Sequence, residues 1–451
     1  MRRDPVPRPR ESHRRYRPRA LAAATTALVL GGLLGGCGGP SFRATSAEGS
    51  YPVVFGVFDP FTGLDATAGP EKMGGCLAAV RLVDAGGGIL SHRQVSCRAF
   101  DDRDDTARAE AAAAVMVRAR GLVGVLGPAG DAGAGAAAVI ERARMTMFSD
   151  SPDPAFSHAA LPYFWRIVPP PEDAGLAMAL WARDQGYTRM AAVFGDDAAE
   201  QAAVPTLVRA FEHLGGTVTI AQAVPLDAAS YRTEIARMLA SSPQALFAGM
   251  DPASAATYVG QAAQAHPLLP IVGGPGTEDP AWWAAVGRAA GAPWLSRHYV
   301  GVEAYAPAAG PAWAAYSRSL QALGARVPDA ALYAADPNAM AAYDAVNIMA
   351  LAMTAAGSTD PAVYNAYVDK VVTGGAGAEV VHDFQEGKRA LESGRVIQYV
   401  GAAGAVRFTR WQSSPGAFQV DSVDATDPTG ERVVATFPAS QVAALAGAPG
   451  I

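Results

Sequence analysis

The stretch that decides the fold is Val53-Val-Phe-Gly-Val-Phe-Asp-Pro-Phe-Thr-Gly63. Its first six residues form a short apolar run, which is typical of a buried strand, and Pro60 and Gly63 favour a turn directly after it. Helical patterns and further apolar runs then alternate at 70–84, 95–100, 106–120, 123–126, 136–144 and 145–149. Strands that alternate with helices in this way predict a parallel sheet covered by helices.

A proline run at 169–171 interrupts this alternation and indicates a boundary, because prolines end helices and stiffen connections. The same alternation then restarts and continues to Val302. Helices follow without strands after Tyr305, and short strand-like pieces return at 397–400, 405–408 and 418–423. We therefore predict an α/β protein with two Rossmann-like lobes on parallel sheets and a C-terminal part that both lobes share. Open sheets of this kind bind ligands at the carboxyl ends of their strands, so the expected site is a cleft between the lobes.

Composition and net charge indicate a folded protein of more than one domain and argue against nucleic-acid binding. The chain has 451 residues, half of them apolar and 17% charged, which suits two or three folded domains. Residues 1–36 hold eight Arg against two acidic residues, so the remainder, with 28 basic and 40 acidic residues, carries a net charge of −12. Such an acidic body argues against nucleic-acid binding as the main task.

Motifs for metal ions, cofactors and catalysis are absent from the sequence. There is no HExxH or CxxC pattern for a transition metal, and no GxSxG, P-loop or Ser-Xaa-Xaa-Lys pattern for an enzyme. A GxGxxA match at 133–138 lies too far past its strand to hold a pyrophosphate in the usual turn. We therefore expect a binding protein without cofactor or metal, and no enzyme.

The N-terminus resembles an export signal. An Arg-rich stretch precedes an apolar run at 20–34, which is too short to span a bilayer comfortably. Leu34-Gly-Gly-Cys37 resembles the lipobox of bacterial lipoproteins, which implies that 1–36 are a signal peptide and that Cys37 is lipidated. Residues 37–50 would then be a flexible tether to the periplasmic or extracellular face of the membrane. The alternative is an ordinary signal peptide that contains a cysteine.

The two remaining cysteines, Cys76 and Cys97, are expected to form a disulfide. Cys76 lies in the first turns of the first helix and Cys97 late in the second strand. A right-handed crossover starts its helix at the end of the sheet where the second parallel strand finishes, so the two residues can meet. The compartment outside the inner membrane permits disulfides. The alternative is a pair of buried thiols.

Several motifs resemble one known family. They are Gly56-Val-Phe-Asp-Pro-Phe-Thr-Gly63, Val83-Asp-Ala-Gly-Gly-Gly-Ile89, Leu126-Gly-Pro128, Ser149 with Asp153-Pro154, Tyr343-Asp-Ala345, and the segment Gly394–Phe408. In this order they resemble the type I solute-binding proteins of ABC importers, in the branched-chain amino-acid and amide group. The resemblance implies a monomer whose lobes close on a small solute and present it to a membrane permease.

The family also implies three crossovers, near 168–172, 302–305 and 399–404. We accordingly expect the first lobe at 51–168 and about 306–395, and the second lobe at 169–305 and about 396–425. Residues 426–451, rich in Ala, Gly and Pro toward the end, are expected to form a loose tail.

The expected ligand site combines loop residues from both lobes. Loop hydroxyls and backbone N–H groups at helix N-termini suit a polar solute. The competing interpretation of most of these residues is a turn or a helix cap. The candidate residues are Thr62, Gly63, Gly130, Asp131, Ser149, Ser151, Asp196, Asp251, Gly274, Glu303 and Tyr305.

The pocket motifs depart from those of amino-acid binders. Asp131 stands in a loop where such proteins carry a hydroxyl, and the loop after Ser149 is one residue shorter than usual. The second lobe lacks the usual Tyr after its first strand and shows Phe194-Gly-Asp-Asp197 instead. The solute therefore stays open, with an amino acid, an amide or a related compound expected. A lipoprotein that senses a ligand and reports to a signalling partner is the alternative function.

Overall fold

The computed structural model describes residues 52–63, 66–90, 94–130, 133–151, 153–274, 276–424 and 431–451. The expected signal peptide, the lipobox cysteine Cys37 and the tether lie outside these ranges, as does the candidate residue Asp131.

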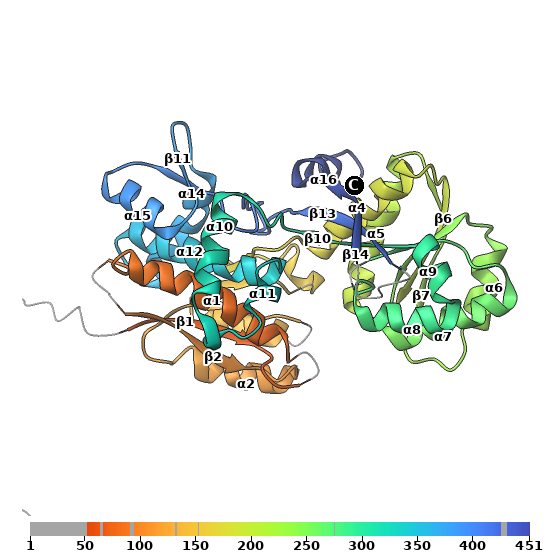
Figure 1. Cartoon of the computed structure of the whole chain (residues 1–451), viewed down its shortest axis with the longest axis horizontal. Helices are drawn as coiled ribbons and strands as arrows, with labels where there is room; N and C mark the ends of the chain where they lie inside the picture. Colours follow the sequence, from red (N-terminus) through yellow and green to blue (C-terminus); the bar gives the residue numbers. More distant parts are fainter. Residues whose placement is uncertain are drawn as a thin grey trace, which may run out of the picture. The chain divides into compact units, whose positions relative to one another are not determined.

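Five parallel strands form the sheet of the first lobe, in the order β2-β1-β3-β4-β5 (Figure 1). They are β1 (Val53–Asp59), β2 (Val95–Asp101), β3 (Leu122–Leu126), β4 (Met147–Ser149) and β5 (Phe164–Arg166). The side chains of β1 alternate between two cores, as a sheet covered on both faces requires. The predicted parallel sheet is therefore confirmed.

Helices cover both faces of this sheet. One face packs against α1 (Ala68–Ala85) and α12 (Pro337–Ala356), and the other against α2 (Thr106–Met116) and α3 (Gly133–Arg142). The segments that complete the lobe are α10 (Gly310–Gln321), α11 (Ala330–Tyr333), α13 (Pro361–Tyr364), α14 (Val368–Thr373), α15 (Phe384–Glu392) and the parallel pair β11 (Glu379–Val381) and β12 (Ile397–Tyr399). Among the described residues, α12 alone is long and apolar enough to span a membrane, and it is the buried central helix of this lobe.

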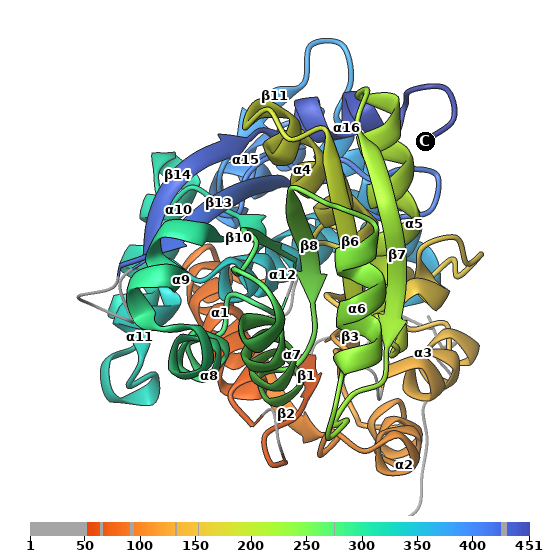
Figure 2. The same ribbon diagram turned by 90° about the vertical axis from the view of Figure 1, so that its right-hand side faces the viewer.

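The second lobe has a seven-stranded sheet in the order β14-β13-β10-β9-β8-β6-β7 (Figure 2). Its parallel part consists of β6 (Arg189–Gly195), β7 (Thr217–Val224), β8 (Ala245–Gly249), β9 (Ile271–Gly273) and β10 (Tyr299–Tyr305). An antiparallel pair, β13 (Ala417–Val423) and β14 (Glu431–Phe437), extends it beyond β10.

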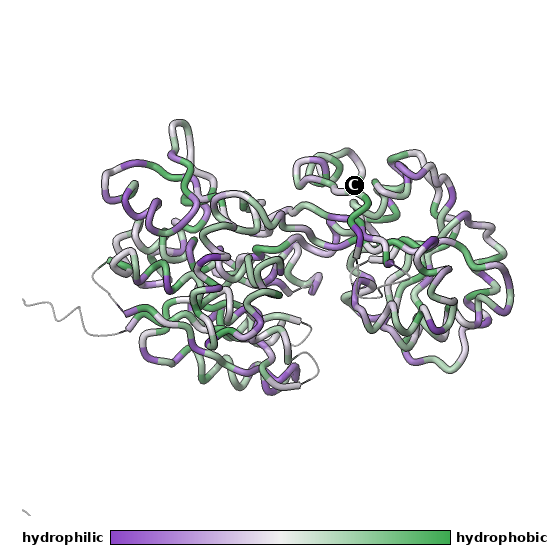
Figure 3. The backbone as a smooth tube through the Cα atoms, viewed as in Figure 1, coloured by the Kyte–Doolittle hydropathy of each residue, from purple (hydrophilic) through white to green (hydrophobic). Residues whose placement is uncertain are grey.

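Two hydrophobic cores sandwich this second sheet. One face packs against α4 (Pro171–Asp184), α5 (Ala198–His213) and α16 (Ala439–Ala446). The other packs against α6 (Arg232–Ala240), α7 (Pro252–Ala265), α8 (Pro280–Ala290) and α9 (Ala292–His298). Figure 3 colours the backbone by hydropathy, and hydrophilic (purple) and hydrophobic (green) stretches alternate along it.

Three segments carry the chain between the lobes. The first follows Arg166, the second follows Tyr305, and the third leads through 407–416 to β13. The third lies beside the first, because Arg166 N–H donates to Gln412 O (2.8 Å) and Ser414 N–H donates to Arg166 O (2.9 Å). Tyr305 in turn lies opposite Ala417 in the sheet, so all three segments are neighbours.

The C-terminal boundaries differ from those expected. Residues 396–406 belong to the first lobe, because β12 pairs with β11 and Val406 packs in the first-lobe core. The third crossover therefore comes later than 399–404, and no strand forms at 405–408. The expected loose tail is also wrong where the structure describes it. β14 and α16 pack on the second lobe, where Phe437, Val442 and Leu445 are buried.

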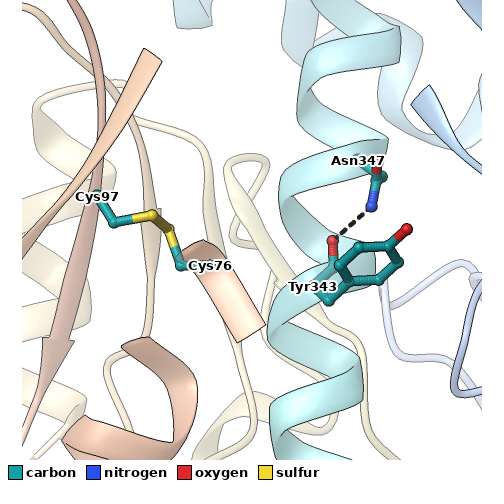
Figure 4. Close-up of a disulfide and its surroundings, with 4 residues drawn as sticks. All are labelled: Cys76, Cys97, Tyr343 and Asn347. Carbon is teal, nitrogen blue, oxygen red and sulfur yellow. Dashed lines mark hydrogen bonds between the residues drawn. A yellow bond between two sulfur atoms is a disulfide. The ribbon is translucent and has the colours of Figure 1, made fainter. Parts of the chain in front are cut away.

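Cys76 and Cys97 form a disulfide, with Cα atoms 6.2 Å apart (Figure 4). The pairing is as predicted, but its position along the elements is not. Cys97 is the third of seven residues in β2, and Cys76 lies halfway along α1. Because α1 runs antiparallel to β2, the middle of the helix meets the middle of the strand. Gly75 faces the other side, where a Cβ would overlap the Ala339 carbonyl, so α1 and α12 approach closely.

Candidate functional site

The loop after β1 holds Thr62 and Gly63 at the carboxyl edge of the first sheet. Asp101, the last residue of β2, binds this loop through the Thr62 hydroxyl (2.6 Å) and the N–H groups of Phe61 and Thr62. Burial raises the pKa of Asp101, but these hydrogen bonds and one from Arg103 N–H outweigh it, so the pKa lies below its ordinary value. Gly63 has φ +120, and a Cβ there would approach Arg103 O at 2.8 Å. Both residues thus shape an exposed loop.

Ser149 and Ser151 join the loops after β3 and β4. The Ser149 hydroxyl donates to Pro128 O (2.6 Å) and accepts from Ser151 N–H. The Ser151 hydroxyl donates to Gly130 O (3.1 Å) and accepts from Asp153 N–H. Both side chains are buried, and their partners all lie within the first lobe. Their observed role is therefore to position the loops that carry Gly130.

The candidates at the ends of β6, β8 and β9 occupy three different environments. Asp196 is exposed after β6, while its neighbour Asp197 caps α5. Asp251 caps α7 through Oδ1, and its buried Oδ2 has no hydrogen-bond partner. Gly274 is buried, and a Cβ there would lie 3.2 Å from the Met178 sulfur. In this structure Asp251 therefore acts as a helix cap, which was the alternative to a ligand contact.

Glu303 and Tyr305 lie at the end of β10, where the second crossover begins. Glu303 accepts a hydrogen bond from Gln419 Nε2 (2.5 Å) on the neighbouring strand β13. Tyr305 lines a cavity of about 500 Å³ at the three crossovers, a volume within the usual range of small-molecule sites. Its walls come from all three crossing segments and from α12, and include Ile167, Pro169, Ala306, Asn338, Ala403 and Pro415.

A buried ion triad in the first lobe was missed by the sequence analysis. Lys72 Nζ, on α1, lies 2.7 Å from Asp59 Oδ1 and 2.7 Å from Asp150 Oδ2, at the ends of β1 and β4. The side chains of Lys72, Asp59 and Asp150 are 7%, 0% and 14% exposed. Asn338 and Lys72 line a small hollow that adjoins the larger cavity through Ile167 and Ala341. The chain has only three Lys, and Lys72 lies close to two glycines in a mostly apolar helical segment. This unusual placement could have indicated a buried, paired lysine.

Charge in this triad is balanced unevenly. Burial lowers the pKa of the Lys72 ammonium, but Asp150 and Asp59 more than offset this, so the pKa lies above its ordinary value. Burial is likewise the main influence on Asp59 and raises its pKa, against the opposing effect of Lys72. Asp59 Oδ2 and Asp150 Oδ1 are buried without a hydrogen-bond partner. The triad therefore has one cation for two carboxyl groups.

Asp344, the central residue of the Tyr343-Asp-Ala345 motif, has a structural role in the first lobe. Its buried carboxylate accepts hydrogen bonds from Tyr399 Oη (2.7 Å) and from the N–H groups of Ala402 and Ala403 (both 2.8 Å). A Cβ at Gly401 would overlap this carboxylate. Asp344 thus fixes the loop that forms one wall of the cavity at the crossovers.

Replacing Asp344 with asparagine is expected to lower the free energy of unfolding by about 2–3 kcal/mol, because the amide would direct an N–H group at backbone donors. Urea unfolding monitored by circular dichroism measures this. Asp360→Asn is the matched control, since Asp360 caps α13 and asparagine caps a helix about equally well. Equal stability of the two variants would contradict this role for Asp344.

The fold and the site together define a two-lobe α/β binding protein of the type I periplasmic class. A family model described as "Periplasmic binding protein" matches residues 52–405, and the chain belongs to this family. The resemblance noted in the sequence is thereby confirmed. Proteins of this family bind solutes outside the cytoplasm and are not enzymes, which confirms the expected binding role.

Solved structures of this class superpose on most of the chain. The leucine-binding protein LivK of Thermotoga maritima is 18% identical and has a TM-score of 0.64, covering 86% of this chain and 99% of its own. A solute-binding protein of an ABC transporter from R. palustris, in complex with 4-hydroxybenzoate, is 17% identical with a TM-score of 0.62 (86% and 97% covered). A substrate-binding protein from Desulfitobacterium hafniense, in complex with Leu, is 16% identical with a TM-score of 0.62 (85% and 100%). No curated protein matches the chain.

Proposed function

We propose that this chain binds a small solute at the crossovers between its lobes and delivers it to the permease of an ABC importer. The observation that carries the proposal is the cavity of about 500 Å³, because all three crossing segments contribute to its wall. A solute there contacts the parts of the chain that bend when the lobes close, so binding and closure are coupled. The similar structures from ABC transporters support the same task.

The solute would contact loops from both lobes in the closed form. Gly130 and Thr62 belong to the first lobe, while Glu303 and Tyr305 end a strand of the second. The exposed backbone of the loops and the partly exposed side chains of Glu303 and Tyr305 supply the polar contacts. The cavity itself is mostly apolar, which suits the carbon skeleton of a small organic molecule.

A lipid anchor at Cys37 would hold the protein at the membrane beside its permease. We also expect the protein to be a monomer. The motif Leu34-Gly-Gly-Cys37 supports this part of the proposal. Two acyl chains anchor a protein stably, since each buried CH₂ group contributes about 0.8 kcal/mol. Cys37→Ser is expected to move the protein from the membrane fraction to the soluble fraction. Retention of the variant at the membrane would contradict the anchor but not solute binding.

Deletion of the gene tests delivery to an importer. In cells that express the chain, deletion is expected to abolish high-affinity uptake of the labelled solute, and a plasmid copy is expected to restore it. Normal uptake after deletion, together with solute binding by the purified protein, would instead favour the sensor. Loss of uptake that the plasmid copy does not restore would trace the defect to a neighbouring gene.

A further inference from the structure

Four carboxyl side chains gather near the strand ends of the second lobe. Glu200 lies in the first turn of α5, Glu278 follows β9, Glu303 lies in β10, and Asp421 lies in β13. We call these four residues the second-lobe carboxylate cluster. Glu303 and Glu200 both lie within electrostatic reach of Glu278, and Asp421 lies beside Glu303.

Gly301 leaves space for part of this cluster. The position of a Cβ at Gly301 lies 3.4 Å from Cγ of Glu278 and 2.7 Å from Oη of Tyr299. Asp421 lies opposite Gly301 in the antiparallel register, and Glu303 lies opposite Gln419, so these side chains share one face of the sheet. The Tyr299 hydroxyl fills the position that a side chain at Gly301 would take, and Glu278, Glu303 and Asp421 lie around it.

Two members of the cluster are buried without full hydrogen bonding. Asp421 is 4% exposed, and its carboxylate lies beside the side chains of Gln419 and Glu303 without a hydrogen bond of good geometry. Oε1 of Glu278 is likewise buried without a partner, and the Tyr299 hydroxyl nearby donates to Thr277 instead. Glu278 still accepts backbone hydrogen bonds from Gly276 and from its own N–H, and burial raises the pKa of both carboxyl groups, so each is costly to ionise unless a positive charge lies beside it.

The second lobe supplies no cation to this cluster from the adjacent loops. The sequence after β6, β8, β9 and β10 contains no Lys or Arg at 195–198, 249–252, 273–279 or 305–309. In the first lobe, Lys72 is already held by Asp59 and Asp150. These stretches therefore offer no basic side chain that could neutralise the cluster.

The Glu200 carboxylate occupies the space that side chains at two glycines would take. A Cβ at Gly249 would overlap the Glu200 carboxylate, and one at Gly276 would lie 3.4 Å from its Oε1. Within the described ranges, no three His, Cys, Asp or Glu side chains converge closely enough to hold a metal ion. The carboxylates of the cluster are therefore not arranged as metal ligands, which leaves an organic cation as the candidate counter-charge.

We propose that the solute of this protein is an organic ammonium ion without a carboxylate, bound by the second-lobe carboxylate cluster. This inference rests on the proposed function and adds the chemical class of the solute. None of the four carboxylates lines the cavity at the crossovers, but Glu303 lies two residues before Tyr305, which does. It departs from the leucine and 4-hydroxybenzoate named for two similar structures, both of which carry a carboxylate. A carboxylate placed beside Glu278 and Glu303 would be repelled.

Calorimetric titration of the purified protein tests the class. The ammonium probes are putrescine, spermidine and choline, and the comparison probes are leucine, 4-hydroxybenzoate and 1,4-butanediol, the uncharged analogue of putrescine. We expect saturable one-to-one binding of at least one ammonium probe and no binding of butanediol. Glu278→Gln and Glu303→Gln are each expected to weaken that binding at least tenfold.

Glu212→Gln provides the matched control, because Glu212 is exposed at the opposite end of α5 from Glu200. Its affinity for the ammonium probe is expected to stay within twofold of the parent. Thermal unfolding of every variant shows whether it is folded. Glu278 and Glu303 are both partly exposed, and Glu303→Gln keeps the test available if Glu278→Gln does not fold.

The pH dependence of the affinity is a second readout, which would not change if the carboxyl groups only packed against their neighbours. Burial raises the pKa of Glu200 to about 8, with smaller contributions from Asp197 and Asp251, and Glu278 and Glu303 also face this region. Below that pH a cation has to displace a proton, so affinity for choline should rise by about tenfold or more from pH 6 to pH 9. Glu200→Gln is expected to flatten this dependence.

The outcomes separate the two levels of the proposal. Binding of leucine, 4-hydroxybenzoate or butanediol with no binding of the ammonium probes overturns the ammonium class but leaves solute binding intact. Ammonium binding that both glutamine variants leave within twofold overturns the role of the cluster. Binding of none of the six probes overturns this inference, and failure of a broad solute screen overturns the proposed function as well.

Discussion

Replacement of Lys72 with methionine is expected to lower the free energy of unfolding by about 3–5 kcal/mol, the largest effect of any single substitution considered. Methionine keeps most of the side-chain volume but removes the only cation between Asp59 and Asp150. Two carboxyl groups that are almost fully buried then face each other without a counter-charge, which is the costly way to break a buried ion pair. Urea unfolding at pH 8 measures the loss.

The pH dependence distinguishes lost charge from lost packing. Burial already raises the pKa of Asp59, and removal of Lys72 raises it further. When the pKa of a carboxyl group is higher in the folded than in the unfolded state, the folded protein becomes less stable as the pH rises above the unfolded-state pKa of about 4. The deficit of the variant should therefore be smaller at pH 5 than at pH 8, and a deficit of the same size at both would contradict the charge argument.

Lys370→Met is the matched control, because Lys370 is exposed in α14. Its free energy of unfolding should stay within about 0.5 kcal/mol of the parent. Adding Asp150→Asn to Lys72→Met should recover part of the loss, since one uncompensated charge disappears. No recovery would contradict the account of the triad.

Removal of the Cys76–Cys97 disulfide is expected to cost about 3 kcal/mol. The bond closes a loop with a sequence separation of 21, and the estimate follows from the chain entropy of the unfolded state. It also fixes α1 against β2, and Lys72 lies one helical turn before Cys76. Chemical unfolding of the Cys76→Ala, Cys97→Ala double variant measures the effect.

A reducing agent supplies the control for this measurement. Reduction should lower the stability of the parent toward that of the double variant and leave the double variant unchanged. If reduction and the double substitution both changed the free energy of unfolding by less than about 0.5 kcal/mol, the bond would not contribute to folding.

Most of the fold was predictable because it follows from local patterns. Alternation of apolar runs and helical patterns predicted both parallel sheets, and the proline run at 169–171 marked the first crossover. The C-terminal part was not predictable in the same way. The sequence before β14 (Glu431–Phe437) is rich in Asp and contains Pro and Gly, and β14 pairs antiparallel with the preceding strand β13, which the Ala- and Gly-rich composition of the C-terminus did not indicate.

The site was less predictable, because its contacts join distant parts of the chain. Ser149 and Ser151 were expected to meet a ligand, but their hydroxyls bind the neighbouring loop. Lys72 and Asp150 are far apart in sequence, and no local pattern places them 2.7 Å apart. Asp344 was recognised only as part of a motif, and its partners Ala402 and Ala403 became evident from the structure.

The central claim is that this protein binds one small solute. Its most direct test is a thermal-shift screen of the purified protein against amino acids, amides, small carboxylates, aromatic compounds, sugars and organic amines. A solute at 100 times its Kd should stabilise the folded state by about 2.7 kcal/mol, a shift of several degrees. We expect such a shift from an organic amine. The absence of any shift across the screen, in protein that unfolds cooperatively, would contradict solute binding.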